Sequence, residues 1–163
     1  MKLRPVITIL VLCALALGLT LYGDNQRHRL DPRLINDILK PPIRTTASNQ
    51  PYSFILESDY LDSISFYQDS FLAAILLFIF SGNQAAAITF GNYIFLAPKS
   101  SASDSSLLIH ELVHTAQYRR DGFIPFMVKY STAWLKSGYS QVPYEIEAIR
   151  ATQDFILTRQ LNN

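Results

Sequence analysis

Two histidines with a glutamate between them have the spacing of a metal site on a helix. His110 and His114 are four residues apart, and Glu111 follows the first of them. Residues i and i+4 stand on one face of a helix, so both imidazoles can reach the same ion. Neutral imidazole is a suitable zinc ligand, and a neighbouring carboxylate can act as a general base toward water. The pattern favours a hydrolytic zinc centre over the alternative, a helix with two histidines and no metal.

A catalytic zinc needs a third protein ligand, and the sequence leaves only carboxylates for it. No histidine follows residue 114, and the single cysteine lies at position 13. Asp121 is too close to the end of the same predicted helix. Glu145, Glu147 and Asp154 share a later predicted helix, on which Glu145 and Glu147 project about 200° apart. We favour Glu145, because small Ala148 lies one turn on and allows close helix packing, and Glu147 remains the alternative.

The elements expected to position these residues are three helices, at about 105–119, 125–137 and 143–160. Asp104, Ser105 or Ser106 can cap the first helix, which should end at Asp121–Gly122. Pro143 suits the first turn of the third helix. Residues 126, 127, 130 and 134 of the middle helix are apolar or aromatic at helical spacing. We interpret them as core, in preference to a membrane-surface or substrate contact.

Shorter elements precede these helices. Residues 87–97 are rich in β-branched and aromatic types around Gly91–Asn92, which predicts a hairpin or a bulged strand. A short strand is expected from Ile64, and a short amphipathic helix at residues 34–39. Together these elements predict a small α+β domain at 51–163, with 24–50 as a linker that carries the short helix.

The N-terminus reads as an export signal. Lys2 and Arg4 precede an apolar or neutral run over residues 6–22, which is near the lower limit for a membrane-spanning helix. Residues 1–23 are therefore predicted to be a signal-anchor or a cleaved signal peptide. The domain would then be extracytoplasmic and membrane-anchored through 6–22, or secreted or periplasmic. A second apolar run, 71–80, is interpreted as a buried core helix, with a second membrane span over 71–90 as the alternative.

Composition narrows the choice of function. The chain has 163 residues, a formal net charge of +1 and 12% aromatic residues. Near-neutral charge argues against a nucleic-acid partner, and the aromatic content argues against a wholly disordered chain. One cysteine excludes an intramolecular disulfide and a cysteine-rich metal site.

The motifs resemble those of a known enzyme class. The segment His110-Glu-Leu-Val-His114, followed by Pro143-Tyr-Glu145-Ile-Glu-Ala148, resembles the gluzincin branch of zinc metallopeptidases. Residues 62–155 are more closely similar to short bacterial metallopeptidase domains, some linked to toxins or contractile injection systems. The resemblance implies a minimal zincin-like fold with a short sheet edge, an active-site helix and a ligand helix. It also implies a peptide or protein substrate added beside the strand 88–96.

The same resemblance implies roles for individual residues. His110, His114 and Glu145 would hold Zn²⁺, and Glu111 would be the catalytic acid and base. Larger gluzincins supply a further histidine or tyrosine to the transition state; here Tyr139, Tyr144 and Arg150 are the candidates. The competing interpretation is a catalytically silent envelope or interaction protein that keeps the zincin scaffold.

Overall fold

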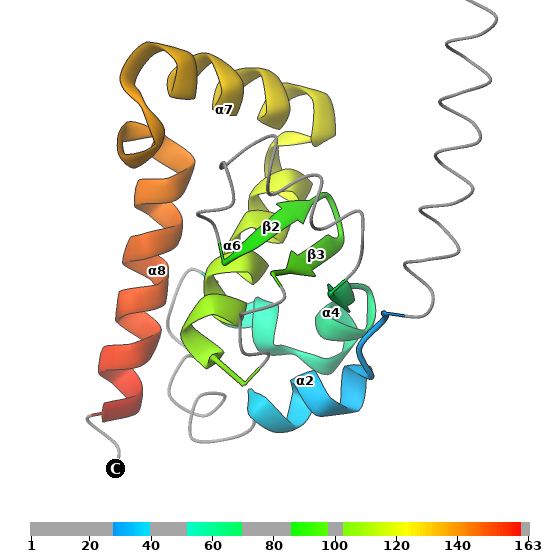
Figure 1. Cartoon of the computed structure of the whole chain (residues 1–163). Helices are drawn as coiled ribbons and strands as arrows, with labels where there is room; N and C mark the ends of the chain where they lie inside the picture. Colours follow the sequence, from blue (N-terminus) through cyan, green and yellow to red (C-terminus); the bar gives the residue numbers. More distant parts are fainter. Residues whose placement is uncertain (1–27, 40–51, 70–85, 98–102, 161–163) are drawn as a thin grey trace, which may run out of the picture.

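The computed structural model describes residues 28–39, 52–69, 86–97 and 103–160 (Figure 1). Its elements, in chain order, are α2 (Pro32–Ile38), η1 (Ser53–Leu56), α4 (Ser58–Asp62), β1 (Ser65–Gln68), β2 (Ala87–Phe90), β3 (Tyr93–Leu96), α6 (Ser105–Asp121), α7 (Phe123–Ser137), η2 (Tyr139–Gln141) and α8 (Pro143–Gln160). Helix α6 lies in the middle, with α8 alongside it, α7 across one end and the β2–β3 hairpin against its face. The predicted α+β class is confirmed.

The sheet has three strands in the order β1–β3–β2. β3 pairs in parallel with β1 and antiparallel with β2. The predicted hairpin is confirmed, and its turn begins at Gly91, whose φ of 64° lies in the left-handed region that favours glycine. The expectation of one edge strand over 88–96 needs correction: only β2 is at an edge, and β3 is central. Residues 28–30 lie along the other edge, beside β1.

Helix α6 begins and ends where its capping residues predict. The Asp104 carboxylate accepts hydrogen bonds from the backbone N–H groups of Ser106 and Leu107, at 3.0 and 3.2 Å. The helix ends at Asp121, and Gly122 with φ 82° terminates it, as the predicted Asp121–Gly122 stop requires. Ten of its side chains are buried, so α6 is the central element of the core.

The last two helices also form as predicted, with one shift in a boundary. α7 begins at Phe123, two residues before Pro125, because Pro125 falls in the first turn, where its missing N–H costs no helical hydrogen bond. α8 begins at Pro143, and Ala148 is fully buried in the core against α6. Its small side chain suits the close approach that brings Glu145 toward the histidines.

Part of the segment expected to be a linker packs into the same core. Ile35 of α2 and Leu39 just after it are 1% and 0% exposed, in one cluster with core residues of α6 and α8. The described part of 24–50 is therefore packed against the domain that follows it.

Two membrane-related expectations fall largely on other parts of the chain. The signal-anchor over 1–23 and the apolar run 71–80 lie outside the described residues. Residues 87–90 form strand β2, so a helical second span reaching residue 90 is wrong for its last four residues. None of the helices in the described ranges is long and apolar enough to cross a membrane.

Candidate metal centre

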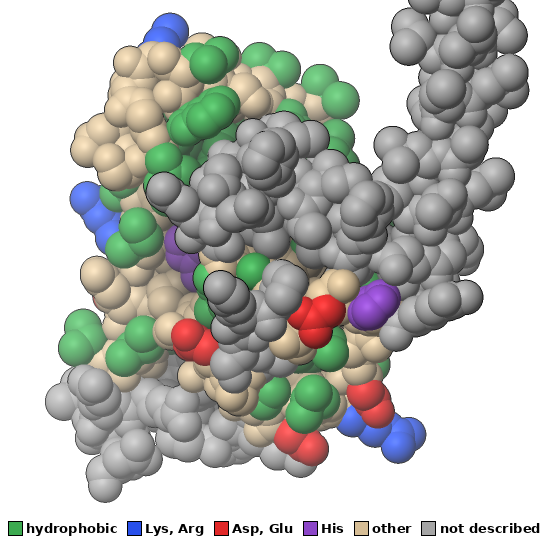
Figure 2. Space-filling model, viewed as in Figure 1, with side chains coloured by type: hydrophobic (Ala, Val, Ile, Leu, Met, Phe, Trp, Pro, Cys, Tyr) green, Lys and Arg blue, Asp and Glu red, His purple; other side chains and the backbone are tan. Residues whose placement is uncertain are grey.

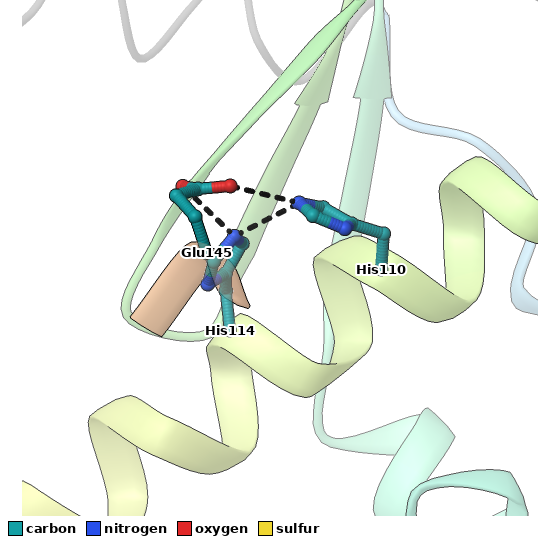
Figure 3. A group of neighbouring side chains, drawn as sticks. All are labelled: His110, His114 and Glu145. Carbon is teal, nitrogen blue, oxygen red and sulfur yellow. Dashed lines mark hydrogen bonds and ion pairs between the residues drawn. The ribbon is translucent and has the colours of Figure 1, made fainter. Parts of the chain in front are cut away.

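The structure brings His110, His114 and Glu145 together where α6 meets α8. Figure 3 shows the two imidazoles on successive turns of α6, pointing toward the Glu145 carboxylate. The two Nε2 atoms are 3.1 Å apart. Each lies 3.3 Å from a Glu145 oxygen, Oε2 for His110 and Oε1 for His114. One candidate ligand atom from each residue lies within 4.8 Å of the other two.

These separations can be tested against the geometry of a zinc site. With metal–ligand bonds of 2.0–2.1 Å, ligand atoms at the corners of a tetrahedron lie about 3.3–3.4 Å apart. The two Nε2 atoms, 3.1 Å apart, lie close to that separation, and each is 3.3 Å from a different oxygen of Glu145. Two nitrogens and one oxygen leave one corner open, which is the pattern of catalytic rather than structural zinc. The residues present could therefore hold a divalent metal ion.

Glu145 is buried but held as a carboxylate. Its side chain is 3% exposed. Burial alone would raise its pKa, but hydrogen bonds from His110 and His114 lower it well below the ordinary range. Two tyrosine hydroxyls also donate to it, Tyr130 to Oε1 at 2.6 Å and Tyr139 to Oε2 at 2.7 Å. Both glutamate oxygens are therefore oriented before any ion arrives.

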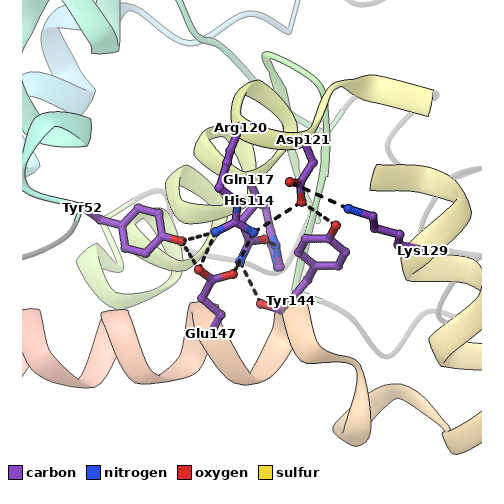
Figure 4. A network of polar contacts seen from close by, with 8 residues as sticks. All are labelled: Tyr52, His114, Gln117, Arg120, Asp121, Lys129, Tyr144 and Glu147. Atoms are coloured by element: carbon purple, nitrogen blue, oxygen red, sulfur yellow. Dashed lines mark hydrogen bonds and ion pairs between the residues drawn. The ribbon is translucent and has the colours of Figure 1, made fainter. Parts of the chain in front are cut away.

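The other nitrogen of His114 is fixed by Gln117, one turn further along α6 (Figure 4). Nδ1 lies 2.8 Å from Gln117 Oε1. The Gln117 amide Nε2 donates to the Tyr144 backbone oxygen and to Glu147 Oε2, both at 3.0 Å. Since Nε2 is the donor, Oε1 is the acceptor, and His114 carries its hydrogen on Nδ1. When the ring is neutral, Nε2 therefore carries the lone pair that a metal ligand requires.

Glu147, the alternative third ligand, lies on a different side of α8. Its Oε1 accepts from Arg120 Nη1 at 2.6 Å and from the Tyr52 hydroxyl. Burial alone would raise the pKa of Glu147, but the hydrogen bonds from Arg120 and Tyr52 outweigh this and hold the pKa below its ordinary value. Figure 4 shows that its carboxylate reaches His114 only through Gln117. Glu145 is the carboxylate placed with the histidines, and Glu147 supports the centre indirectly.

Glu111, the candidate acid and base, is oriented from the sheet edge. The Thr89 hydroxyl of β2 donates to Glu111 Oε2 at 2.5 Å. Glu111 is 5% exposed, and it lines a pocket together with His114 and Glu145. A carboxylate held beside the ligands, and not among them, is placed to exchange a proton with a molecule in that pocket.

The wall of the pocket opposite β2 is helix α7. The interpretation of the apolar stripe as core holds for Phe126, which is 3% exposed and packs between the rings of Tyr118 and Tyr144. It is wrong for Trp134, which lines the pocket and remains 39% exposed, because α7 crosses one end of α6 and Phe126 is its only fully buried residue.

The three candidates for transition-state stabilisation are placed differently. Tyr139 lies at the centre, bonded to Glu145. The Tyr144 hydroxyl donates to Asp121 at 2.5 Å, so its hydrogen bond is made outside the centre. Arg150 is exposed and lines another hollow, beside Glu147.

Sequence analysis missed Gln117 and Tyr130, which both contact the ligands. A usable signal existed for each. Gln117 lies one turn after His114, on the same helix face, and Tyr130 belongs to the aromatic stripe assigned to the core. The stripe's spacing could not show that one hydroxyl points toward α8.

Residues 80–122 match the family model of the eCIS core domain. The matched stretch is about a quarter of the chain and contains the β2–β3 hairpin and all of α6, so it includes His110 and His114 but not Glu145. The match links the chain to proteins related to contractile injection systems, as part of the sequence resemblance implied. No curated protein and no solved structure matches the chain.

Proposed function

We propose that the chain is a zinc-dependent metallopeptidase of the gluzincin type, built on a minimal zincin-like fold. The observation that carries the proposal is the convergence of His110, His114 and Glu145, with one donor atom of each within 4.8 Å of the others, beside a pocket that also contains Glu111. A structural zinc site would have no use for a free carboxylate at that position. Its presence favours hydrolysis over a silent scaffold.

The chemistry divides between the ion and the chain. When bound, zinc supplies a Lewis acid and lowers the pKa of water toward about 7. Glu111 accepts a proton from the attacking water on a carboxylate oxygen and later donates it to the leaving amine. The Thr89 hydroxyl holds that carboxylate toward the pocket.

Two tyrosines define the opposite side of the centre. Burial, and then the nearby Glu145 charge, raise the pKa of Tyr130 and Tyr139 far above neutrality, so both hydroxyls remain donors. In the ligand-free arrangement both donate to Glu145. Because Tyr139 is 53% exposed, we propose that its hydroxyl turns from Glu145 toward a carbonyl oxygen that becomes negatively charged.

We extend the proposal to location and partner on sequence grounds. The apolar run over residues 6–22 would anchor an extracytoplasmic domain, or direct its export if it is cleaved. The substrate would be a peptide or protein, bound along the β2 edge of the sheet.

Exchange of Glu111 for glutamine tests the activity. The Glu111→Gln variant removes the base but keeps the shape and the zinc ligands. We expect it to bind zinc at one equivalent, as the wild type does, while peptide hydrolysis falls by a factor of at least about 100. The matched control is Glu57→Gln, an exposed residue outside the centre, which should retain full activity. Equal hydrolysis by wild type and Glu111→Gln would contradict the role of Glu111, and no hydrolysis by either would support the silent scaffold instead.

A further inference from the structure

The pocket beside the metal centre is polar at one end and apolar along one side. Glu111, His114 and Glu145 form the polar end. The long side is formed by α7, through Met127, Tyr130, Ser131, Trp134 and Leu135, facing Ile88 and Phe90 of β2. A molecule that reaches the ligands must therefore lie against α7.

Along the α7 side of the pocket, none of the described lining residues carries a charge. Among the described residues that line the pocket, the only acids and bases other than tyrosines are Glu111, His114 and Glu145. The proposed chemistry uses all three. A charged substrate side chain against α7 would lose its hydration without a compensating ion pair, whereas an apolar one would gain by burial.

The exposure of α7 points to the same conclusion. Phe126 is its only fully buried residue. Trp134 and Leu135 both line the pocket and yet are 39% and 79% exposed. Figure 2 shows hydrophobic side chains gathered over α7 on this face of the molecule. Large apolar side chains left uncovered beside a polar site are typical of a ligand-binding surface.

We propose that α7 selects the substrate, and that the site takes peptides presenting a large apolar or aromatic side chain next to the bond to be cleaved. Met127, Trp134 and Leu135 contact that side chain. The proposal rests on the proposed function for the reaction, but the binding preference itself needs no metal. It can therefore be tested separately from hydrolysis.

Trp134 is a built-in reporter, because it is the only tryptophan in the chain. The experiment titrates the metal-free full-length protein with blocked tripeptides, acetyl-Ala-Phe-Ala-amide and acetyl-Ala-Lys-Ala-amide, and follows tryptophan fluorescence. We expect the phenylalanine peptide to shift the emission saturably and to bind about tenfold or more tightly than the lysine peptide, as burial of an aromatic side chain implies.

A pair of variants on the same helix assigns the effect to the pocket. Leu135→Asp places a charge on the lining, while Val128→Asp places the same charge on α7 at a residue that is 60% exposed and does not line the pocket. Leu135→Asp should abolish the tenfold preference, and Val128→Asp should keep it. No preference in the wild type, or equal loss in both variants, overturns the proposal. Preferential binding without zinc-dependent hydrolysis supports the pocket but contradicts the proposed function.

Discussion

The junction of α6 with α8 and the wall formed by α7 differ in how they are held. At the junction, α6 buries ten side chains, and the ligands sit within a dense set of hydrogen bonds. In α7 only Phe126 is buried, and its second half carries exposed apolar residues. The two regions meet at the pocket, where one supplies charge and the other supplies apolar surface.

The difference separates geometry from selectivity. Donor atoms that must lie about 3.3 Å apart need rigid support, and packing of α6 on α8 provides it. A surface that only has to accept an apolar group needs no such support. Substitutions at the junction should therefore change metal binding, while substitutions on the outer face of α7 should leave both metal binding and stability nearly unchanged.

Loss of a ligand from the junction should have the largest effect. Glu145→Ala removes one of three protein ligands, and zinc affinity should fall by about a thousandfold if each ligand carries its share of roughly 10–16 kcal/mol. Asp154→Ala, an exposed carboxylate on the same helix, is the control and should bind zinc as the wild type does. Zinc titration in competition with a chelating indicator measures both. Equal losses in the two variants would mean that the site is elsewhere.

The next largest effect should be the difference in stability between substitutions of a buried and an exposed residue of α7. Phe126→Ala removes a ring whose centroid is 3.9 Å from that of Tyr118, and should lower the free energy of unfolding by about 3–5 kcal/mol. Val128→Ala, two residues on but 60% exposed, should change it by less than about 0.5 kcal/mol. Urea unfolding followed by circular dichroism compares them. A large cost at Val128 would show that its face of α7 is covered.

Support for His114 can be removed without touching a ligand. Gln117→Leu leaves Nδ1 of His114 without its acceptor, and the loss of such a contact behind a histidine ligand weakens metal binding about 10- to 100-fold. Zinc titration gives the affinity. Thr152→Val is a control of similar burial on α8, where the hydroxyl has no hydrogen-bond partner in the structure. Unchanged affinity in Gln117→Leu would show that α6 alone orients the ring.

The junction was easier to predict from the sequence than the wall. His110, Glu111 and His114 lie on one helix, and the i, i+4 rule places them on one face whatever the rest of the chain does. The helix of Glu145 was recognisable from Pro143; the angle to Glu147 meant that only one of the two could face the histidines, and Ala148 favoured Glu145. In each case a local rule was sufficient.

The wall depends on contacts between helices distant in sequence. An aromatic stripe has the same spacing whether it packs on a core or lines a pocket, so Phe126 and Trp134 could not be told apart. The Tyr130 hydroxyl reaches Glu145 only because α7 and α8 fold back on each other through η2. For the same reason Tyr144 was a candidate for the centre, although its hydroxyl bonds Asp121.

The tyrosines provide a finer comparison across the two regions. Tyr130→Phe keeps the ring of α7 but removes the hydrogen bond to Glu145, and zinc affinity should fall about two- to tenfold, the net value of a typical intramolecular hydrogen bond. Tyr144→Phe removes a similar bond to Asp121 outside the centre and should leave zinc affinity unchanged. Isothermal titration calorimetry resolves such factors. Equal affinities for the wild type and Tyr130→Phe would show that the Tyr130 hydroxyl does not support metal binding.

The smallest effect should come from the outer edge of the junction. The pKa of Glu147 is lowered in the folded state, so it stabilises the fold above the ordinary value of 4.5, and this contribution is lost as the pH falls below it. Because Arg120 is 48% exposed, we expect Glu147→Gln to cost only a few tenths of a kcal/mol at pH 7. Thermal unfolding at pH 7 and pH 3 measures the difference from wild type, which should be smaller at pH 3. A difference between the variant and the wild type that grows in acid would contradict a stabilising contribution from the Glu147 carboxylate.

The most direct test of the centre is X-ray absorption spectroscopy of the zinc-loaded protein at one equivalent. If His110, His114 and Glu145 hold the ion, the first shell contains two imidazole nitrogens at about 2.0–2.1 Å, with oxygen in the remaining positions and no sulfur. A shell made only of oxygen, or one that includes sulfur, would place the ion elsewhere and contradict the assignment.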